Sequence, residues 1–107
     1  MSGRVIVVDD EAAIREAVQQ WLELSGFRVQ SCATAAQALG LVDRDFPGVV
    51  ISDVRMPGTD GLQLLDKLLE LDRDLPVIMV TGHGDVPMAV QALRQGAYDF
   101  IEKPFTP

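Results

Sequence analysis

A chain of 107 residues, 48% of them hydrophobic, suits one domain with one core and is too apolar for a disordered tail. Its net charge of −7 argues against direct binding of a nucleic-acid backbone by this segment, which would require a basic face. No apolar run approaches the roughly 20 residues of a membrane helix, and the single cysteine, Cys32, excludes an internal disulfide and predicts a cytoplasmic protein.

The first half of the chain alternates short apolar runs with helical patterns. A strand is predicted over residues 4–8, and the helix after it is expected to stop at Gly26. A second strand over 27–31 leads to a helix capped by Thr34, with Gln37 as its capping-box partner. The side chains expected to face inward are Ile14, Ala17, Val18, Trp21, Leu22, Ala35, Ala38, Leu39 and Val42, and those expected outward on the first helix are Arg15, Glu16, Gln19, Gln20 and Glu23.

The second half continues the alternation. Strands are predicted over residues 49–53, 77–80 and 98–101, with helices over 62–71 and from an N-cap at Asp85 to Gly96. The run 49–53 is apolar on consecutive positions, as expected for a strand covered on both faces. The expected inward side chains are Leu65, Leu68, Leu69, Val86, Ala89, Val90 and Leu93. Met88 and Gln91 are candidates for an outward partner surface, with ordinary packing an equal alternative for Met88. We expect Cys32 to be a small buried filler, because no base or metal-ligand partner lies near it in sequence.

This alternation predicts an α/β fold with a parallel sheet and helices on both faces. The pattern normally closes with a helix after the last strand, yet only three residues follow Pro104. We therefore expect the last helix to be absent from this chain and part of the sheet face beside the first helix to be bare.

Polar side chains stand at four predicted strand ends. Asp9 and Asp10 follow the first strand, Asp53 ends the third, Thr81 ends the fourth, and Lys103 follows the fifth. In a doubly wound sheet these ends converge on one edge. Three clustered carboxylates repel one another and suit a hard divalent cation such as Mg²⁺. With a lysine and a hydroxyl nearby, they make a site for a transferring phosphoryl group, with Asp53 as the nucleophile.

Simpler interpretations exist for each residue alone. Asp10 precedes the first helix and could cap it, Asp60 suits a turn, and an isolated Lys103 would be a solvated surface residue. Their combination at four strand ends is what favours a functional site.

Four motifs in order carry a family resemblance. VVDDE at residues 7–11, DVRMPGTDG at 53–61, VTG at 80–82 and KPF at 103–105 resemble the receiver domain of two-component response regulators. The resemblance implies a flavodoxin-like sheet of order 2-1-3-4-5. It also implies that Asp53 accepts a phosphoryl group from a sensor histidine kinase. Asp10, Asp53 and the backbone carbonyl of Arg55 would bind Mg²⁺, with Asp9 acting through water.

The same resemblance implies a conformational switch. Thr81 would be the switch hydroxyl and Lys103 the lysine that pairs with the phosphoryl group. Phe100 occupies the position of the family's switch aromatic, although a plain core role for it is an equal alternative. Phosphorylation would remodel the face formed by the fourth helix and the fifth strand, and a homodimer through this face is expected.

A narrower resemblance covers residues 81–90 and 96–105. These segments are similar to regulators that activate the nitrogen-type sigma factor, especially the four-carbon dicarboxylate transport group. That group joins its receiver to an AAA+ ATPase and a helix-turn-helix DNA-binding domain, so residues 1–107 would be a receiver lacking its output domain. Regulators with a simpler helix-turn-helix output share much of the segment and remain an alternative.

Two other classes of protein share part of this pattern. Phosphatases with an aspartyl nucleophile need a second acid two residues after it, where this chain has Arg55. A contact-only module would be expected to lack Asp10, Asp53 or Lys103, and all three are present. We therefore expect a phosphoacceptor regulatory domain that catalyses only its own phosphorylation and dephosphorylation.

Overall fold

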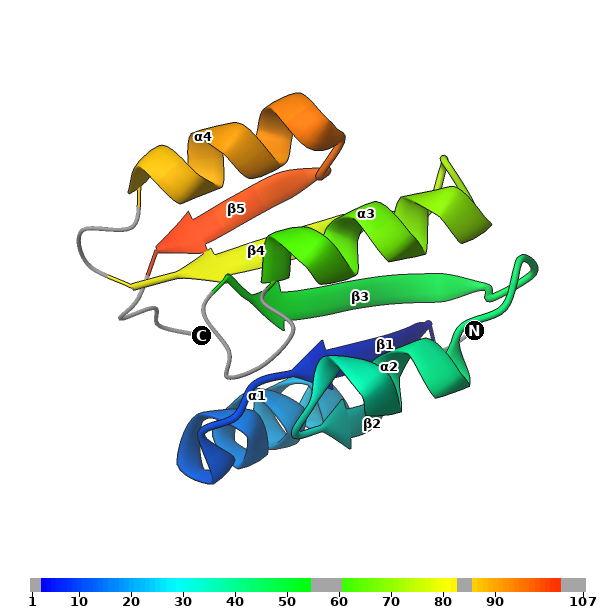
Figure 1. The fold of residues 1–107 in the computed structure, drawn as a ribbon. Helices are drawn as coiled ribbons and strands as arrows, with labels where there is room; N and C mark the ends of the chain where they lie inside the picture. Colours follow the sequence, from blue (N-terminus) through cyan, green and yellow to red (C-terminus); the bar gives the residue numbers. More distant parts are fainter. Residues whose placement is uncertain (1–2, 55–60, 83–85, 103–107) are drawn as a thin grey trace.

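Helices and strands alternate along the whole described part of the chain (Figure 1). The computed structural model describes residues 3–54, 61–82 and 86–102. Its strands are β1 (Arg4–Val8), β2 (Arg28–Cys32), β3 (Gly48–Asp53), β4 (Val77–Thr81) and β5 (Asp99–Glu102), and its helices are α1 (Ala12–Leu24), α2 (Ala35–Leu41), α3 (Gly61–Leu71) and α4 (Val86–Gln95). Each predicted element is confirmed, with bounds that shift by one or two residues.

The strands form one parallel sheet in the order β2-β1-β3-β4-β5, which is the predicted flavodoxin-like order. After β1 the chain crosses to β2 on one side, and after β2 it returns to β3 on the other side of β1. The connections leaving the carboxyl ends of β1 and β3 therefore diverge, and such a switch point is where folds of this type place their sites.

The helices are divided unequally between the two faces of the sheet. In Figure 1, α2, α3 and α4 lie in front of the sheet and α1 lies behind it. Strand side chains alternate, so Ile6 and Val8 join the larger core on the α2–α3 side, while Val5 and Val7 pack with Val18 of α1. Among the described elements, α1 alone covers the second face.

None of the described elements covers the far edge of that second face, in agreement with the prediction of a bare region there. Ile101 of β5 pairs in register with Val80, and Phe100 pairs with Met79, which belongs to the core on the other face. Ile101 therefore points toward the α1 side, where it is 40% exposed.

The predicted inner faces of two helices need correction. On α4 the buried residues are Ala89 and Ala92, whereas Val86, Val90 and Leu93, predicted to face inward, are 38–40% exposed. Met88 packs against the larger core, which is the packing alternative of the two considered for it. Alanines let the helix lie close to the sheet, and the bulkier residues flank that line of contact. On α1, Ala17 is exposed rather than buried.

Local signals for helix ends were mostly correct. Thr34 Oγ1 accepts the Gln37 amide hydrogen at 3.2 Å, as the cap prediction required. Gly26 and Gly96 follow α1 and α4 with φ of 96° and 119°, the left-handed region that favours glycine. The simpler alternative, in which Asp10 only caps the first helix, does not hold: the N-cap of α1 is Glu11, and its side chain makes no capping hydrogen bond. The Asp85 cap lies outside the described residues.

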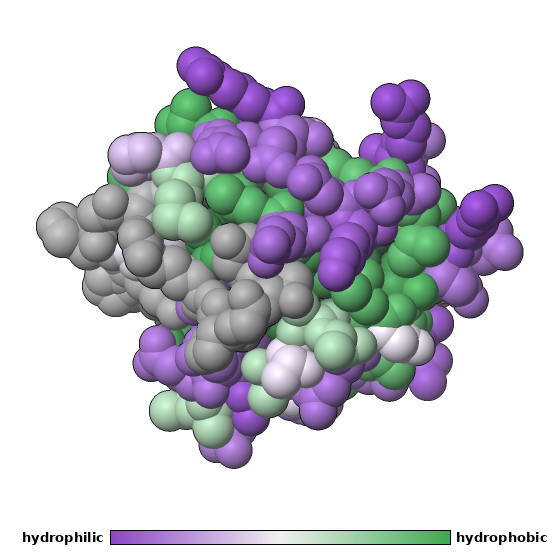
Figure 2. All heavy atoms as spheres, viewed as in Figure 1, coloured by the Kyte–Doolittle hydropathy of each residue, from purple (hydrophilic) through white to green (hydrophobic). Residues whose placement is uncertain are grey.

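The surface over the three-helix face is mostly hydrophilic. Figure 2 shows polar side chains gathered over α3 and α4, with hydrophobic side chains between them. None of the described helices is long and apolar enough to cross a membrane.

Candidate functional site

Three carboxylates meet at the switch point. Asp9 and Asp10 follow β1, and Asp53 ends β3, which pairs with β1 up to the Val8–Ser52 pair. Each acid offers one oxygen, and these three oxygens lie within 4.8 Å of one another. Asp9 and Asp53 are 3% and 7% exposed, while Asp10 is exposed. Two buried oxygen donors with a third open to solvent suit a hard, partly hydrated cation such as Mg²⁺.

The backbone of Asp9 is fixed on both sides. Its amide donates to the carbonyl of Cys32 at 3.1 Å, which extends the β1–β2 pairing by one residue. Its Oδ1 accepts the Glu11 amide hydrogen at 2.9 Å, and its carbonyl accepts a 2.6 Å hydrogen bond from Arg15 Nη1. Arg15 was expected on the outer polar face of α1, but its guanidinium turns back to the end of β1. The sequence signal was an arginine in the first turn of the helix that follows the acids.

The position of Asp53 depends on the close approach of α3 to the end of β3. The carbonyl of Val54 accepts the Gly61 amide hydrogen at 2.8 Å, so α3 begins directly against the end of β3. A Cβ atom on Gly61 would lie 2.3 Å from the Asp53 carbonyl oxygen and 2.7 Å from Val54 Cα. Only glycine fits there without moving the strand end that carries Asp53. From the sequence, Gly61 lies just before the helix predicted over residues 62–71, and this packing role was not predicted.

Comparisons with known proteins agree with this geometry. A family model described as the response regulator receiver domain matches residues 5–107. The chain belongs to the receiver domain family of two-component response regulators. It is therefore a phosphoacceptor regulatory module, as the sequence resemblance implied.

Individual relatives are transcription regulators. The chain is 61% identical over 101 residues to the C4-dicarboxylate transport transcriptional regulatory protein DctD of Rhizobium meliloti, covering 94% of this chain and 22% of that protein. It is 44% identical to the transcriptional regulatory protein FixJ of Bradyrhizobium diazoefficiens, covering 96% of this chain and 50% of that protein. The crystal structure of the receiver domain of NtrX from Brucella abortus matches with a TM-score of 0.90 and 42% identity, covering 95% and 87% of the two chains. The receiver thus spans about a fifth of the length of DctD.

The remaining predicted site residues of the receiver are only partly described. Thr81 ends β4 and is fully buried, and its Oγ1 has no hydrogen-bond partner among the described residues. Phe100 is half-buried and packs against the larger core. The predicted site residues Arg55 and Lys103 lie outside the described residues, as does Asp60, which the sequence assigns to a turn.

Cys32 is a buried filler beneath the acids, as predicted. It is 2% exposed, and burial raises the pKa of its thiol, although the nearby charge of Arg15 lowers that pKa in part. A thiol with a raised pKa stays protonated at neutral pH and is a poor nucleophile.

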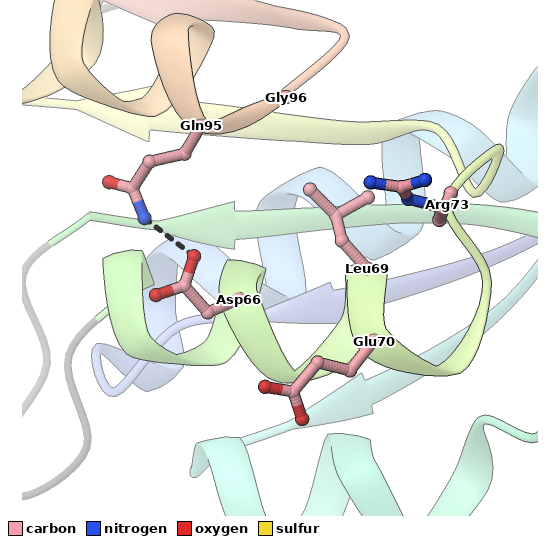
Figure 3. A pocket seen from close by; sticks show the side chains of 6 residues that line it. All are labelled: Asp66, Leu69, Glu70, Arg73, Gln95 and Gly96. Atoms are coloured by element: carbon pink, nitrogen blue, oxygen red, sulfur yellow. Dashed lines mark hydrogen bonds between the residues drawn. The ribbon is translucent and has the colours of Figure 1, made fainter.

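A second acidic region lies between α3 and α4 of the receiver. A hollow of about 480 Å³ is lined by Asp66, Leu69, Glu70, Arg73, Gln95 and Gly96 (Figure 3). Gln95 Nε2 donates to Asp66 Oδ1 at 2.7 Å and joins the two helices. Asp66 and Glu70 are exposed and four residues apart on one helix. They do not belong to a set of convergent metal ligands among the described residues.

Proposed function

We propose that Asp53 is the phosphoacceptor and takes its phosphoryl group from a sensor histidine kinase. A carboxylate oxygen of Asp53 attacks phosphorus, the phosphorus–nitrogen bond of the kinase phosphohistidine breaks, and the imidazole leaves with the electron pair. The product is an acyl phosphate on Asp53. The observation that carries this proposal is the convergence of Asp9, Asp10 and Asp53 within 4.8 Å, with Asp53 at the end of the central strand.

Mg²⁺ is the proposed cofactor of this site. Asp10, Asp53 and the backbone carbonyl of Arg55 would hold the ion directly, and Asp9 would hold it through water. When bound, the ion neutralises negative charge on the phosphoryl oxygens. The protein's contribution is to hold three mutually repelling carboxylates in place, and the hydrogen bonds to the Asp9 main chain and side chain support that role. Lys103 is proposed to pair with the phosphoryl group.

The proposed switch begins at Thr81. Within the part of the chain that the structure describes, its buried hydroxyl has no partner, so donation to a phosphoryl oxygen on Asp53 would break no hydrogen bond seen there. Movement of Thr81 toward Asp53 would leave space for Phe100 and alter the α4–β5 face. The exposed Val86, Val90 and Leu93 make this face suitable for a partner, which we propose is a second copy of the receiver.

We propose that residues 1–107 form the receiver domain of a longer cytoplasmic transcription regulator. The output would be an AAA+ ATPase joined to a DNA-binding domain, because the 61% identity to DctD exceeds the 44% identity to FixJ. A simple helix-turn-helix output is the second candidate. The receiver itself carries a net charge of −7 and is not proposed to bind nucleic acid. Its catalysis would be limited to its own phosphorylation and dephosphorylation.

The test is phosphorylation by a small acyl phosphate in the presence of Mg²⁺. Intact-mass measurement should find one base-labile phosphoryl group on the parent chain and none on Asp53→Asn, because an amide cannot form the acyl phosphate. Asp66→Asn is the matched control, since it removes an acid between α3 and α4, and it should label as the parent does. Equal labelling of Asp53→Asn would overturn the assignment. A folded parent that takes no label would favour a contact-only module.

A further inference from the structure

Arg15 connects the first turn of α1 to the end of β1. Its backbone amide donates to the Glu11 carbonyl at 3.0 Å, which places it in that first turn. Its side chain is half-buried, and Nη1 donates to the Asp9 carbonyl oxygen at 2.6 Å. A guanidinium donor makes this a charge-assisted hydrogen bond, roughly twice as strong as a neutral one. The contact therefore closes the β1–α1 connection around the two acids.

We propose that Arg15 is a positioning residue for the acid cluster. The carbonyl it holds belongs to the peptide that joins Asp9 to Asp10, so the orientation of that peptide sets the direction of both carboxylates. The Asp9 amide is already tied to Cys32, and Asp9 Oδ1 is tied to the Glu11 amide. With Arg15, the peptide is held from the strand side and from the helix side. The part of this proposal that concerns Mg²⁺ rests on the proposed function.

The positive charge of Arg15 also affects Mg²⁺ affinity directly, and this effect opposes the gain in affinity expected from positioning. A cation near the cluster relieves repulsion between the carboxylates but also repels Mg²⁺. If charge dominated, removing Arg15 would strengthen Mg²⁺ binding. If positioning dominates, as proposed, removing it weakens binding. Mutations of groups that orient metal ligands typically cost ten- to a hundredfold in affinity, so the expected loss for Arg15→Ala is about tenfold.

Two measurements on Arg15→Ala, Arg15→Lys and Arg15→Gln test the proposal. The first is hydrogen exchange of the Glu11 amide without metal, taken relative to the Leu68 amide in the core. This exchange should be about tenfold faster in Arg15→Ala, because the Asp9 side chain no longer holds the Glu11 amide in one geometry. The second is Mg²⁺ affinity by calorimetry. Arg15→Lys and Arg15→Gln should fall between the parent and alanine in both measurements. Arg28→Ala, an exposed arginine on β2, should match the parent.

Each outcome decides a separate question. Glu11 exchange unchanged in Arg15→Ala would overturn the positioning role. Faster exchange with Mg²⁺ affinity equal to or above the parent would overturn the link to the metal. A parent chain that does not bind Mg²⁺ would overturn the proposed metal function, while the exchange measurement would still decide whether Arg15 orients the acids.

Discussion

The receiver has two acidic regions that differ in how the fold presents them. At the carboxyl ends of β1 and β3, Asp9, Asp10 and Asp53 bring three oxygens within 4.8 Å, and two of these side chains are buried. Between α3 and α4, Asp66 and Glu70 lie on one helix, are exposed, and share their surroundings with Arg73 (Figure 3). The hollow beside the second pair is large enough for a ligand, but its acids do not converge.

Convergence, rather than the number of acids, separates the two regions. Strands far apart in sequence end at one edge of a parallel sheet, so their terminal side chains meet there, with Asp9 and Asp53 buried and Asp10 exposed. Acids one turn apart on a helix surface stay hydrated, and a glutamine suffices to bind one of them, as Gln95 binds Asp66. The three carboxylates at the ends of β1 and β3 repel one another, and a bound cation would relieve that repulsion. The contact between Asp66 and Gln95 is an ordinary polar contact between two helices.

Replacing one acid in each region by its neutral amide should give the largest difference in Mg²⁺ affinity. Asp10→Asn should lower Mg²⁺ affinity by about a hundredfold, because it removes a direct ligand where even outer-shell changes cost ten- to a hundredfold. Asp66→Asn should leave the affinity within about twofold of the parent, since surface charges at a distance are screened. Calorimetry at one ionic strength measures both. Similar losses in the two variants would mean that Mg²⁺ responds to overall charge rather than to the cluster.

Two glycines extend the comparison to the backbone. A Cβ on Gly61 would lie 2.3 Å from the Asp53 carbonyl oxygen, and a Cβ on Gly48, at the opposite end of β3, would lie 2.2 Å from the Arg4 carbonyl oxygen. Both Gly61→Ala and Gly48→Ala should lower the free energy of unfolding by about 1–3 kcal/mol through overpacking, measured by urea denaturation. Of the two variants, only Gly61→Ala should also lower the Mg²⁺ affinity of the molecules that remain folded, because only this substitution displaces the strand end that carries Asp53.

Gly40→Ala is the control for these substitutions. Nothing lies within 4 Å of a Cβ there, and the position is inside α2. It should raise the free energy of unfolding by about 0.5–1 kcal/mol through helix propensity alone. Unchanged Mg²⁺ affinity in the folded fraction of Gly61→Ala would show that the approach of α3 does not set the Asp53 geometry.

The strands and the acid cluster could be predicted because both follow from short-range signals, whereas the sheet order was implied by the family resemblance. Apolar runs marked the strands, and polar residues directly after them had to meet at one edge. The Thr34 cap was predictable for the same reason, since its partner Gln37 is three residues away. The four motifs then specified the receiver family, although residues such as Lys103 lie outside the described part of the structure.

What could not be predicted depends on distances between elements. Periodicity assigned Val90 of α4 to the inner face, but the sheet accepts the smaller Ala89 and Ala92. Arg15 has the helical position of a solvated residue, and only the direction of its side chain brings it to Asp9. The role of Gly61 follows from how closely α3 begins against β3. Sequence periodicity does not predict any of these distances between elements.

The smallest expected effect is on the free energy of unfolding, when the same substitution is made at two threonines. Thr81 is fully buried and its Oγ1 has no partner in residues 3–54, 61–82 and 86–102, whereas Thr34 Oγ1 accepts the Gln37 amide hydrogen at the start of α2. Thr81→Val should raise the free energy of unfolding by about 1 kcal/mol, because it removes an unsatisfied buried hydroxyl without changing side-chain shape. Thr34→Val should lower it by about 1 kcal/mol, because it removes a helix cap. Urea denaturation measures both signs.

The Thr81 result also bears on the proposed switch, which starts from a buried hydroxyl at the end of β4. If Thr81→Val gains stability and still labels on Asp53, but phosphorylation no longer alters its self-association in sedimentation experiments, then the unsatisfied hydroxyl is the group that detects the phosphoryl oxygen. A loss of stability in Thr81→Val would mean that the hydroxyl is already hydrogen-bonded in solution. Donation to a phosphoryl group would then require breaking that bond, and the proposed switch would lose the free energy that drives Thr81 toward Asp53.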